Sequence, residues 1–171
     1  MQLSVGELFA QTDQYVVPKS KVEKLSLGQY LPDITLNDQN KNVIALSSFS
    51  GKYVLIQFWA SWCKPSRADN AILGSIYSNY KNKSFVTGSG FEIYSISLDD
   101  NESNWRKAIN EDNAAQWYQV SELMGVNSNV ARRLSVTAIP ANILIDGDGK
   151  VIASQFKISE LNNILETNLQ K

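Results

Sequence analysis

The sequence predicts an α/β domain with a central mixed sheet, helices on both faces of the sheet, and an N-terminal β-hairpin. Three observations predict this class. Residues 53–59 form a nearly continuous apolar run, which is typical of a strand covered on both faces. A helical pattern over residues 63–80 and a strand pattern over residues 91–98 follow, and such alternation favours parallel pairing. A strand–turn–strand pattern over residues 142–156 makes the sheet mixed.

The first 30 residues carry only weak patterns. We interpret residues 1–30 as an N-terminal extension lying on the domain, with a flexible tail as the alternative, and residues 31–171 as the domain itself. Residues 5–10 are compatible with a short helix, and Pro18 interrupts the chain after them. The length of 171 residues suits one domain with an extension.

Beyond residue 31, hydrophobic periodicity and turn composition predict each element. Polar–apolar alternation over residues 32–37 and 42–46, around the polar segment 38–41, predicts the first hairpin. The helix at 63–80 rests on apolar residues at a spacing near 3.6. The other predicted elements are a connector at 48–51, a surface loop at 82–90, a helix at 102–111 capped by Asn101 or Ser103, a short strand or loop at 117–120, a short helix at 128–134, strands at 142–146 and 150–156, and a final amphipathic helix from 159 onward.

Composition excludes several classes of site. The chain has no histidine, so histidine-based triads and histidine metal sites are excluded. A single cysteine excludes thiolate metal clusters and an intramolecular disulfide, and we expect no cofactor. The net charge of −1, with acids and bases interspersed, indicates neither a nucleic-acid surface nor a membrane surface. The segment 146–149 resembles part of a calcium loop but lacks the remaining ligands, so a hairpin turn is favoured.

Two readings of location stay open. No apolar run reaches the roughly 20 residues that span a bilayer. The first residues lack the basic and apolar regions of a signal peptide. The protein is therefore either cytoplasmic or numbered from a point after a removed signal.

The segment Trp62-Cys63-Lys64-Pro65-Ser66 holds the only cysteine, at the junction between the predicted strand and the predicted helix. Unpaired backbone N–H groups and the macrodipole at a helix N-terminus lower the pKa of a thiol, and Lys64 adds a cation. Pro65 is tolerated in the first helical turn, where N–H groups have no intrahelical partner. The alternative is that Cys63 is only a small buried hydrophobe.

The stretch FWASWCKPSR resembles the active-site segment of the thioredoxin superfamily, in which the pattern is W-C-x-x-C. Other segments resemble the exported thioredoxin-like branch more weakly, but they occur in the same order and at the same spacing as in that branch. The branch includes thiol-disulfide oxidoreductases used in cytochrome c maturation. They are Pro32-Asp-Ile-Thr-Leu, Gly51-Lys-Tyr-Val-Leu, Ser95-Ile-Ser-Leu-Asp99 and Val136-Thr-Ala-Ile-Pro140 through Asp146. The resemblance covers residues 31–171 and implies a thioredoxin-like fold and a periplasmic or exported location.

The resemblance also implies roles for individual residues. Ser66 takes the position of the resolving cysteine; its hydroxyl cannot attack a mixed disulfide but can donate a hydrogen bond to a Cys63 thiolate. Whether Ser66 is natural or an introduced substitution stays open. Ile139-Pro140 matches the cis-proline beside the active-site turn, where the backbone pairs with an extended substrate, the alternative being a strand-initiating proline. Gln57 takes the place of a buried acid, and packing under the site explains it equally well.

We therefore expect a thiol-disulfide oxidoreductase that acts through Cys63 by mixed disulfides. Its substrate would be a protein carrying a disulfide or thiol, with a small-molecule thiol or a membrane electron donor as further candidates. The alternative function is a redox-inactive binding module that uses the groove at Ile139-Pro140. A peroxidase is disfavoured because the residues before Cys63 lack the proline and threonine of the peroxiredoxin pattern. Trp62 is expected at the rim of the site, where its ring can support a bound peptide.

Overall fold

The computed structural model describes residues 15–16 and 25–171. The predicted helix at 5–10 and Pro18 lie outside these residues. The strands are β1 (Tyr15–Val16), β2 (Thr35–Asp38), β3 (Val43–Ala45), β4 (Tyr53–Trp59), β5 (Ser84–Phe85), β6 (Gly88–Ser89), β7 (Phe91–Ser97), β8 (Tyr118–Ser121), β9 (Ala138–Ile139), β10 (Ala141–Ile145) and β11 (Val151–Ser154). The α-helices are α2 (Lys64–Tyr80), α3 (Glu102–Glu111), α4 (Asn129–Arg133) and α5 (Leu161–Thr167). The 3-10 helices are η1 (Leu46–Phe49), η2 (Ala114–Gln116), η3 (Gly125–Asn127) and η4 (Ile158–Glu160).

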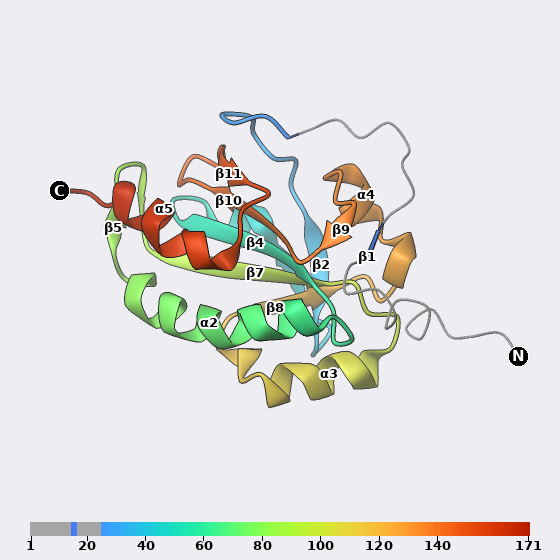
Figure 1. Cartoon of the computed structure of the whole chain (residues 1–171). Helices are drawn as coiled ribbons and strands as arrows, with labels where there is room; N and C mark the ends of the chain where they lie inside the picture. The colour runs from blue at the N-terminus through green and yellow to red at the C-terminus, as the bar shows by residue number, and fades with distance from the viewer. Residues whose placement is uncertain (1–14, 17–24) are drawn as a thin grey trace, which may run out of the picture.

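The main sheet has seven strands in the order β11-β10-β4-β7-β8-β2-β3 (Figure 1). β4, β7 and β8 are parallel neighbours, whereas β10 is antiparallel to β4 and β2 is antiparallel to β8. The sheet is therefore mixed, and β2–β3 is the N-terminal hairpin, as the sequence predicts. Because parallel strands end at one edge of a sheet, the segments after β4 and β7 lie side by side there. The N–H of Leu98 donates to the Trp59 carbonyl at 2.8 Å across this edge.

Helical segments cover both faces of the sheet, as predicted. Successive side chains along β4 point to opposite faces of the sheet, as in any strand. Leu55 and Trp59 belong to one apolar cluster with residues of α2, α3 and α5, and both α2 and α3 run beneath the sheet in Figure 1. Ile56 and Phe58 belong to a second cluster with residues of η1 and α4 on the opposite face. β4 is thus buried along its whole length, which explains its continuous apolar sequence.

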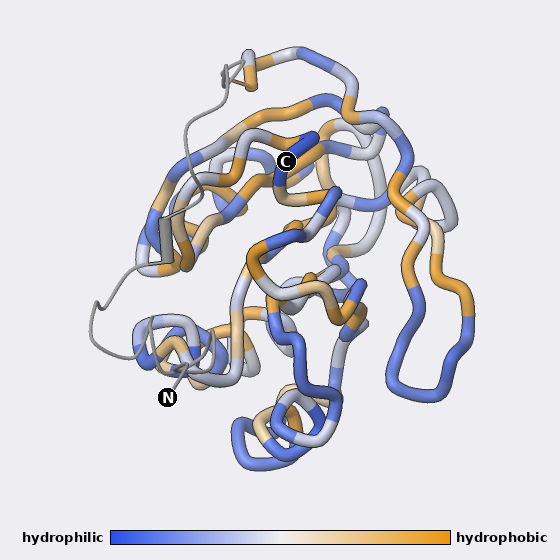
Figure 2. The backbone as a smooth tube through the Cα atoms, turned by 90° about the vertical axis from the view of Figure 1, so that its right-hand side faces the viewer, coloured by the Kyte–Doolittle hydropathy of each residue, from blue (hydrophilic) through white to orange (hydrophobic). Residues whose placement is uncertain are grey.

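Most predicted boundaries are confirmed within one or two residues. Asn101 caps α3, since its side chain accepts a hydrogen bond from the Asn104 N–H at 2.9 Å. The last strand ends at Ser154, two residues early, because Gln155 has a left-handed backbone with φ of 57°. The predicted loop at 82–90 contains the short β5–β6 hairpin. In Figure 2 hydrophobic and hydrophilic stretches alternate along the backbone, and the ends of several peripheral loops are hydrophilic.

The turn at 146–149 is a hairpin turn. Asp146 Oδ1 accepts hydrogen bonds from the backbone N–H groups of Asp148 and Lys150, both at 3.0 Å. This carboxylate therefore caps its own turn, as expected for a tight turn begun by aspartate.

No helix among the described residues combines the length and the apolar character that a membrane crossing needs.

Candidate active site

Cys63 lies between the end of β4 and the first turn of α2. It is the N-cap residue of α2, with an extended backbone (φ −91°, ψ 100°), and its carbonyl accepts the Arg67 N–H at 3.0 Å. Pro65 occupies the first turn, where a missing N–H costs no intrahelical bond. Cys63 is 4% exposed, and its Sγ lies 3.9 Å from the Ile139 carbonyl oxygen. The thiol is therefore buried at the N-terminus of α2, where N–H groups have no intrahelical partner.

Ser66 follows Cys63 by one helical turn and is fully buried. Within the described part of the chain its hydroxyl has no hydrogen-bond partner. The expected hydrogen bond from Ser66 concerns a Cys63 thiolate, which is a stronger, charged acceptor than a neutral thiol.

The loop that ends in Pro140 lies against the active-site turn. The Ile139–Pro140 peptide bond is cis, and Ile139 is buried in the same apolar cluster as Cys63. Trp62 is half-buried and packs against this cluster, while Lys64 is exposed. The structure therefore brings Cys63 and the Ile139-Pro140 segment together, although 76 positions separate Cys63 from Ile139.

Gln57 belongs to a buried polar network beneath α2. Its amide nitrogen donates to Asn70 Oδ1 at 3.0 Å, and its amide oxygen accepts the Ser95 hydroxyl at 2.6 Å. Ser95 in turn accepts the indole N–H of Trp117 at 2.9 Å. Every member is buried, so each hydrogen bond satisfies a group that water cannot reach. The sequence singled out Gln57, but its partners lie on other elements and carry no motif.

The network continues to a clamp on the segment before Cys63. Asn70 Nδ2 donates to Asp112 Oδ2 at 2.8 Å, and the Arg67 guanidinium binds the same carboxylate. Arg67 also donates to the Ser61 carbonyl at 3.1 Å and to Glu111 at 3.0 Å. These carboxylates, Asp112 first, raise the pKa of Arg67 above its usual value. Arg67 thus ties the turn at Ser61 to the end of α3.

Asp99 holds the same turn from the other side. It accepts the Ser61 N–H at 3.0 Å and the hydroxyls of Ser61 and Ser97. Burial raises the pKa of Asp99, and the hydrogen bonds from Ser61 and Ser97 oppose that rise. Ser61, two residues before the thiol, is therefore fixed at its N–H, its hydroxyl and its carbonyl.

Asp69 is a titratable residue that sequence reasoning missed. It lies on α2 one turn after Ser66, and burial raises its carboxyl pKa from 3.8 to about 6. Asp69 lies three residues after Ser66, which is a spacing between neighbours on a helix surface. It lies six residues after Cys63, about 120° around the helix axis, so helical spacing does not place it beside the thiol.

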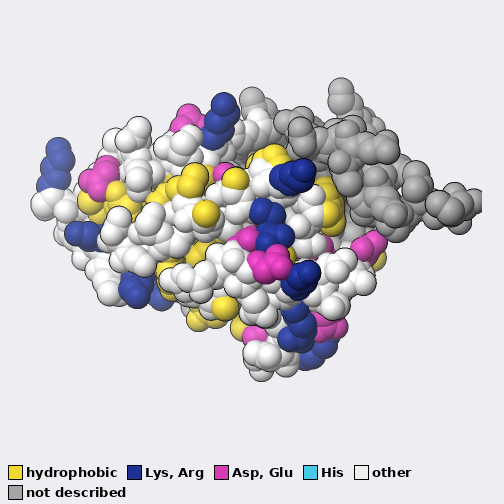
Figure 3. Space-filling model, turned by 60° about the horizontal axis from the view of Figure 1, so that its bottom comes forward, with side chains coloured by type: hydrophobic (Ala, Val, Ile, Leu, Met, Phe, Trp, Pro, Cys, Tyr) yellow, Lys and Arg dark blue, Asp and Glu magenta, His cyan; other side chains and the backbone are white. Residues whose placement is uncertain are grey.

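Charged side chains of both signs are interspersed on the surface formed by α2 and α3 (Figure 3). The ion pairs of this surface include Arg67–Glu111, Arg106–Glu102 and Lys107–Glu111. Because Arg67 is paired with carboxylates, its positive charge is largely neutralised. The exposed Lys64 is the cation next to the thiol in sequence.

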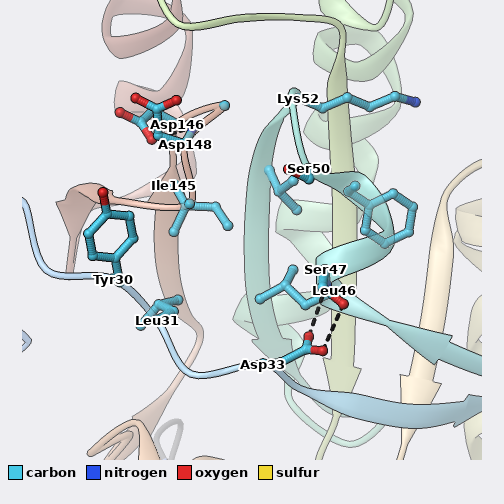
Figure 4. Close-up of a pocket in the computed structure, with 14 residues that line it drawn as sticks. Tyr30, Leu31, Asp33, Leu46, Ser47, Ser50, Lys52, Ile145, Asp146 and Asp148 are labelled. Atoms are coloured by element: carbon cyan, nitrogen blue, oxygen red, sulfur yellow. Dashed lines mark hydrogen bonds between the residues drawn. The ribbon is translucent and has the colours of Figure 1, made fainter.

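Two cavities accompany the fold. One, of about 500 Å³, lies beside the proline loop and is lined by Ala138, Pro140 and Asn142 among others. The other, of about 200 Å³, lies between the segment before β2, η1 and the β10–β11 turn, where Asp33 accepts hydrogen bonds from Ser47 (Figure 4). Its lining contains none of the predicted site residues. Of these two cavities in the described part of the chain, the first adjoins Pro140.

Comparison with known proteins agrees with this geometry. A family profile described as thioredoxin-like matches residues 51–151. The chain belongs to the thioredoxin-like family. Thiol-disulfide oxidoreductase ResA of Bacillus cereus is 31% identical over 154 residues, covering 89% of this chain and 82% of that protein. Tryparedoxin of Trypanosoma brucei brucei is 29% identical over 131 residues, covering 75% of this chain and 85% of that protein.

Solved structures resemble this thioredoxin-like chain as well. The thioredoxin domain of a thiol-disulfide oxidoreductase from Bacteroides vulgatus has a TM-score of 0.75 and 34% identity, covering 84% of this chain and 98% of that one. A C-terminal domain of a putative thiol-disulfide oxidoreductase from Bacteroides thetaiotaomicron has a TM-score of 0.75 and 35% identity, covering 85% and 97%. The predicted thioredoxin-like fold is confirmed, and the chain has the oxidoreductase role of its family.

Proposed function

We propose that this protein carries out thiol–disulfide exchange through Cys63 as its single nucleophile. The Cys63 thiolate attacks one sulfur of a substrate disulfide, forms a mixed disulfide with it, and expels the other sulfur as a thiolate. The observation that carries the proposal is the position of Cys63 at the N-cap of α2, with its Sγ beside the Ile139 carbonyl. An extended substrate would pair with the backbone at Ile139 and present its disulfide to the thiol.

Opposing effects act on the thiol. Burial in apolar surroundings disfavours a thiolate, whereas the N-terminus of a 17-residue helix favours it. The Lys64 ammonium adds to the second effect. The Ser66 hydroxyl, which lacks a partner beside the neutral thiol, would donate to the thiolate. We expect the helix, the cation and the hydroxyl together to outweigh burial.

Release of the mixed disulfide requires a thiol from elsewhere, because the Ser66 hydroxyl cannot displace a sulfur. That thiol is either a second thiol of the substrate or a small-molecule thiol such as glutathione. In the first route the substrate's second thiol attacks the mixed disulfide, so a new substrate disulfide forms and Cys63 is released. In the second route the small thiol forms a disulfide with the group bound to Cys63, and Cys63 is released. A single-cysteine site therefore favours isomerisation, deglutathionylation or trapping over net reduction of a disulfide to a dithiol.

The test is the alkylation rate of Cys63 by iodoacetamide as a function of pH, with Cys63→Ser as the blank. We expect the midpoint to lie below the value of about 8.5 of an unperturbed thiol. Mass spectrometry after incubation with oxidised glutathione should show one added glutathione on Cys63. A midpoint at or above the unperturbed value, with no adduct, would reject exchange and favour a redox-inactive module that binds partners at Ile139-Pro140.

A further inference from the structure

The backbone edge next to the thiol is already occupied by the chain itself. β1 pairs with β9 in antiparallel register, with Tyr15 opposite Ile139 and Val16 opposite Ala138 (Figure 1). These two strands form a sheet of their own, apart from the seven-stranded sheet. A segment more than 120 positions away in sequence therefore lies along the loop that ends in cis-Pro140.

The position of this pair matters because Ile139 also contacts the nucleophile. Its carbonyl oxygen lies 3.9 Å from Cys63 Sγ. Paired residues of antiparallel strands lie about 4.5–5.5 Å apart at Cα, so the backbone at Tyr15 lies on the order of 10 Å from the thiol. A peptide that adds to the edge of a sheet binds through main-chain hydrogen bonds. One edge of β9 cannot pair with β1 and with such a peptide at the same time.

A second observation places the next described residue after β1 at the same loop. Leu25 lines the cavity of about 500 Å³ together with Ala138 and Pro140. Leu25 also packs, partly buried, against the apolar cluster that contains Ile139. β1, which pairs with β9, and Leu25, which lines the cavity beside Pro140, are therefore two described parts of the first 25 residues that lie near the proline loop.

We infer that β1 is a built-in competitor for the substrate edge, so that an extended substrate must displace Tyr15–Val16 before it reaches Cys63. This inference rests on the proposed function, because it concerns access to the same thiol. Because β1 belongs to the same chain as β9, its pairing is intramolecular and does not depend on protein concentration. A pair of only two residues is nevertheless weak, so a longer peptide can replace it.

The test compares two double variants of the full chain. Tyr15→Pro with Val16→Pro removes both β1 amide donors and is incompatible with regular strand pairing. Tyr15→Phe with Val16→Ile keeps strand propensity and serves as the matched control. The first readout is hydrogen exchange of the β9 amides at Ala138 and Ile139, which needs no redox chemistry. The second is the rate of mixed-disulfide formation between Cys63 and a peptide carrying one disulfide in an extended sequence.

We expect the proline variant to lose β9 protection and to react with the peptide about two- to tenfold faster, because apparent affinity scales with the fraction of chains whose edge is open. Alkylation by iodoacetamide, which needs no strand pairing, should stay the same in all forms. Equal peptide rates, or unchanged β9 protection, in the proline variant would overturn the inference. A protection that rises with protein concentration in the control would also overturn it, since the occupant would then be a second copy. A last outcome is that Cys63 reacts with neither the disulfide peptide nor iodoacetamide while protection of β9 still depends on β1. In that case the proposed function fails, and the occupancy of the β9 edge by β1 stands.

Discussion

The carboxyl of Asp69 should make the stability of this protein fall as pH rises from about 4 to about 6. Burial raises its pKa from 3.8 to about 6, so the folded state holds this proton more tightly than the unfolded state does. Below about pH 4 Asp69 is protonated in both states and does not lower the free energy of unfolding. Between the two pKa values only the unfolded chain releases the proton, and the native state progressively loses relative stability. Above about pH 6 the full loss is present.

The size of the loss follows from the shift. A difference of about two pKa units corresponds to about 3 kcal/mol, since one unit equals about 1.4 kcal/mol. Asp69 is only partly buried, so water and side-chain motion reduce this figure, and we expect about 1–3 kcal/mol. Asp69→Asn removes the charge while keeping size and polarity. The variant should therefore exceed the parent by this amount at about pH 7.5 and match it at about pH 4.

The assay is urea unfolding of both proteins at several values between about pH 4 and pH 7.5, with Asp148→Asn, at an exposed turn position, as the matched control. Other carboxyls also shift, those of Asp33 and Glu102 downward and that of Asp99 upward. The difference between variant and parent cancels their contributions, provided that their surroundings do not change. A difference that is constant across this range, or that appears equally in the control, would refute the reasoning.

Three further outcomes are expected. Ser66→Cys should enable reduction of insulin disulfides; a folded variant whose new thiol never bridges to Cys63 would contradict the placement of both residues in one turn. Asp112→Asn should lower the free energy of unfolding by about 1–3 kcal/mol, because Arg67 loses a charged hydrogen bond, and should slow peptide exchange more than iodoacetamide alkylation. Gln57→Leu should lower the free energy of unfolding by about 2–5 kcal/mol, since it leaves two buried partners unsatisfied. A loss under about 1 kcal/mol in urea unfolding would show instead that the network relaxes.

The parts of the fold that local patterns determine were predictable. The strand at 53–59 matches β4, because burial on both faces requires an unbroken apolar run. The helix starting at Cys63 matches α2, whose first turn tolerates Pro65. Both hairpins were predicted from the polar turns between alternating strands. Each of these signals lies within about 20 consecutive residues, where period and turn chemistry suffice.

The contacts that position the site were not predictable in this way. Gln57 was recognised by its place before the active-site segment, but Asn70 and Ser95 meet it only after the chain has crossed between strands. The Arg67–Asp112 clamp joins two helices over 45 positions and has no local signature. Such hydrogen bonds depend on sheet order and helix packing, which single-sequence patterns do not encode.

In the mechanism proposed above, the Cys63–Ser66 pair gives a physical reason why a site with one sulfur would be reactive. A buried hydroxyl without a partner costs about 1–3 kcal/mol, and Ser66 carries that cost while Cys63 is a neutral thiol. Loss of the thiol proton creates a charged acceptor one helical turn away and removes the cost. The penalty in the resting state thus favours the thiolate, in the same direction as the N-terminus of α2. A second thiol at position 66 would resolve mixed disulfides but would donate a weaker hydrogen bond. In the proposed mechanism, serine at this position therefore gives up resolution of the mixed disulfide and stabilises the nucleophile more strongly.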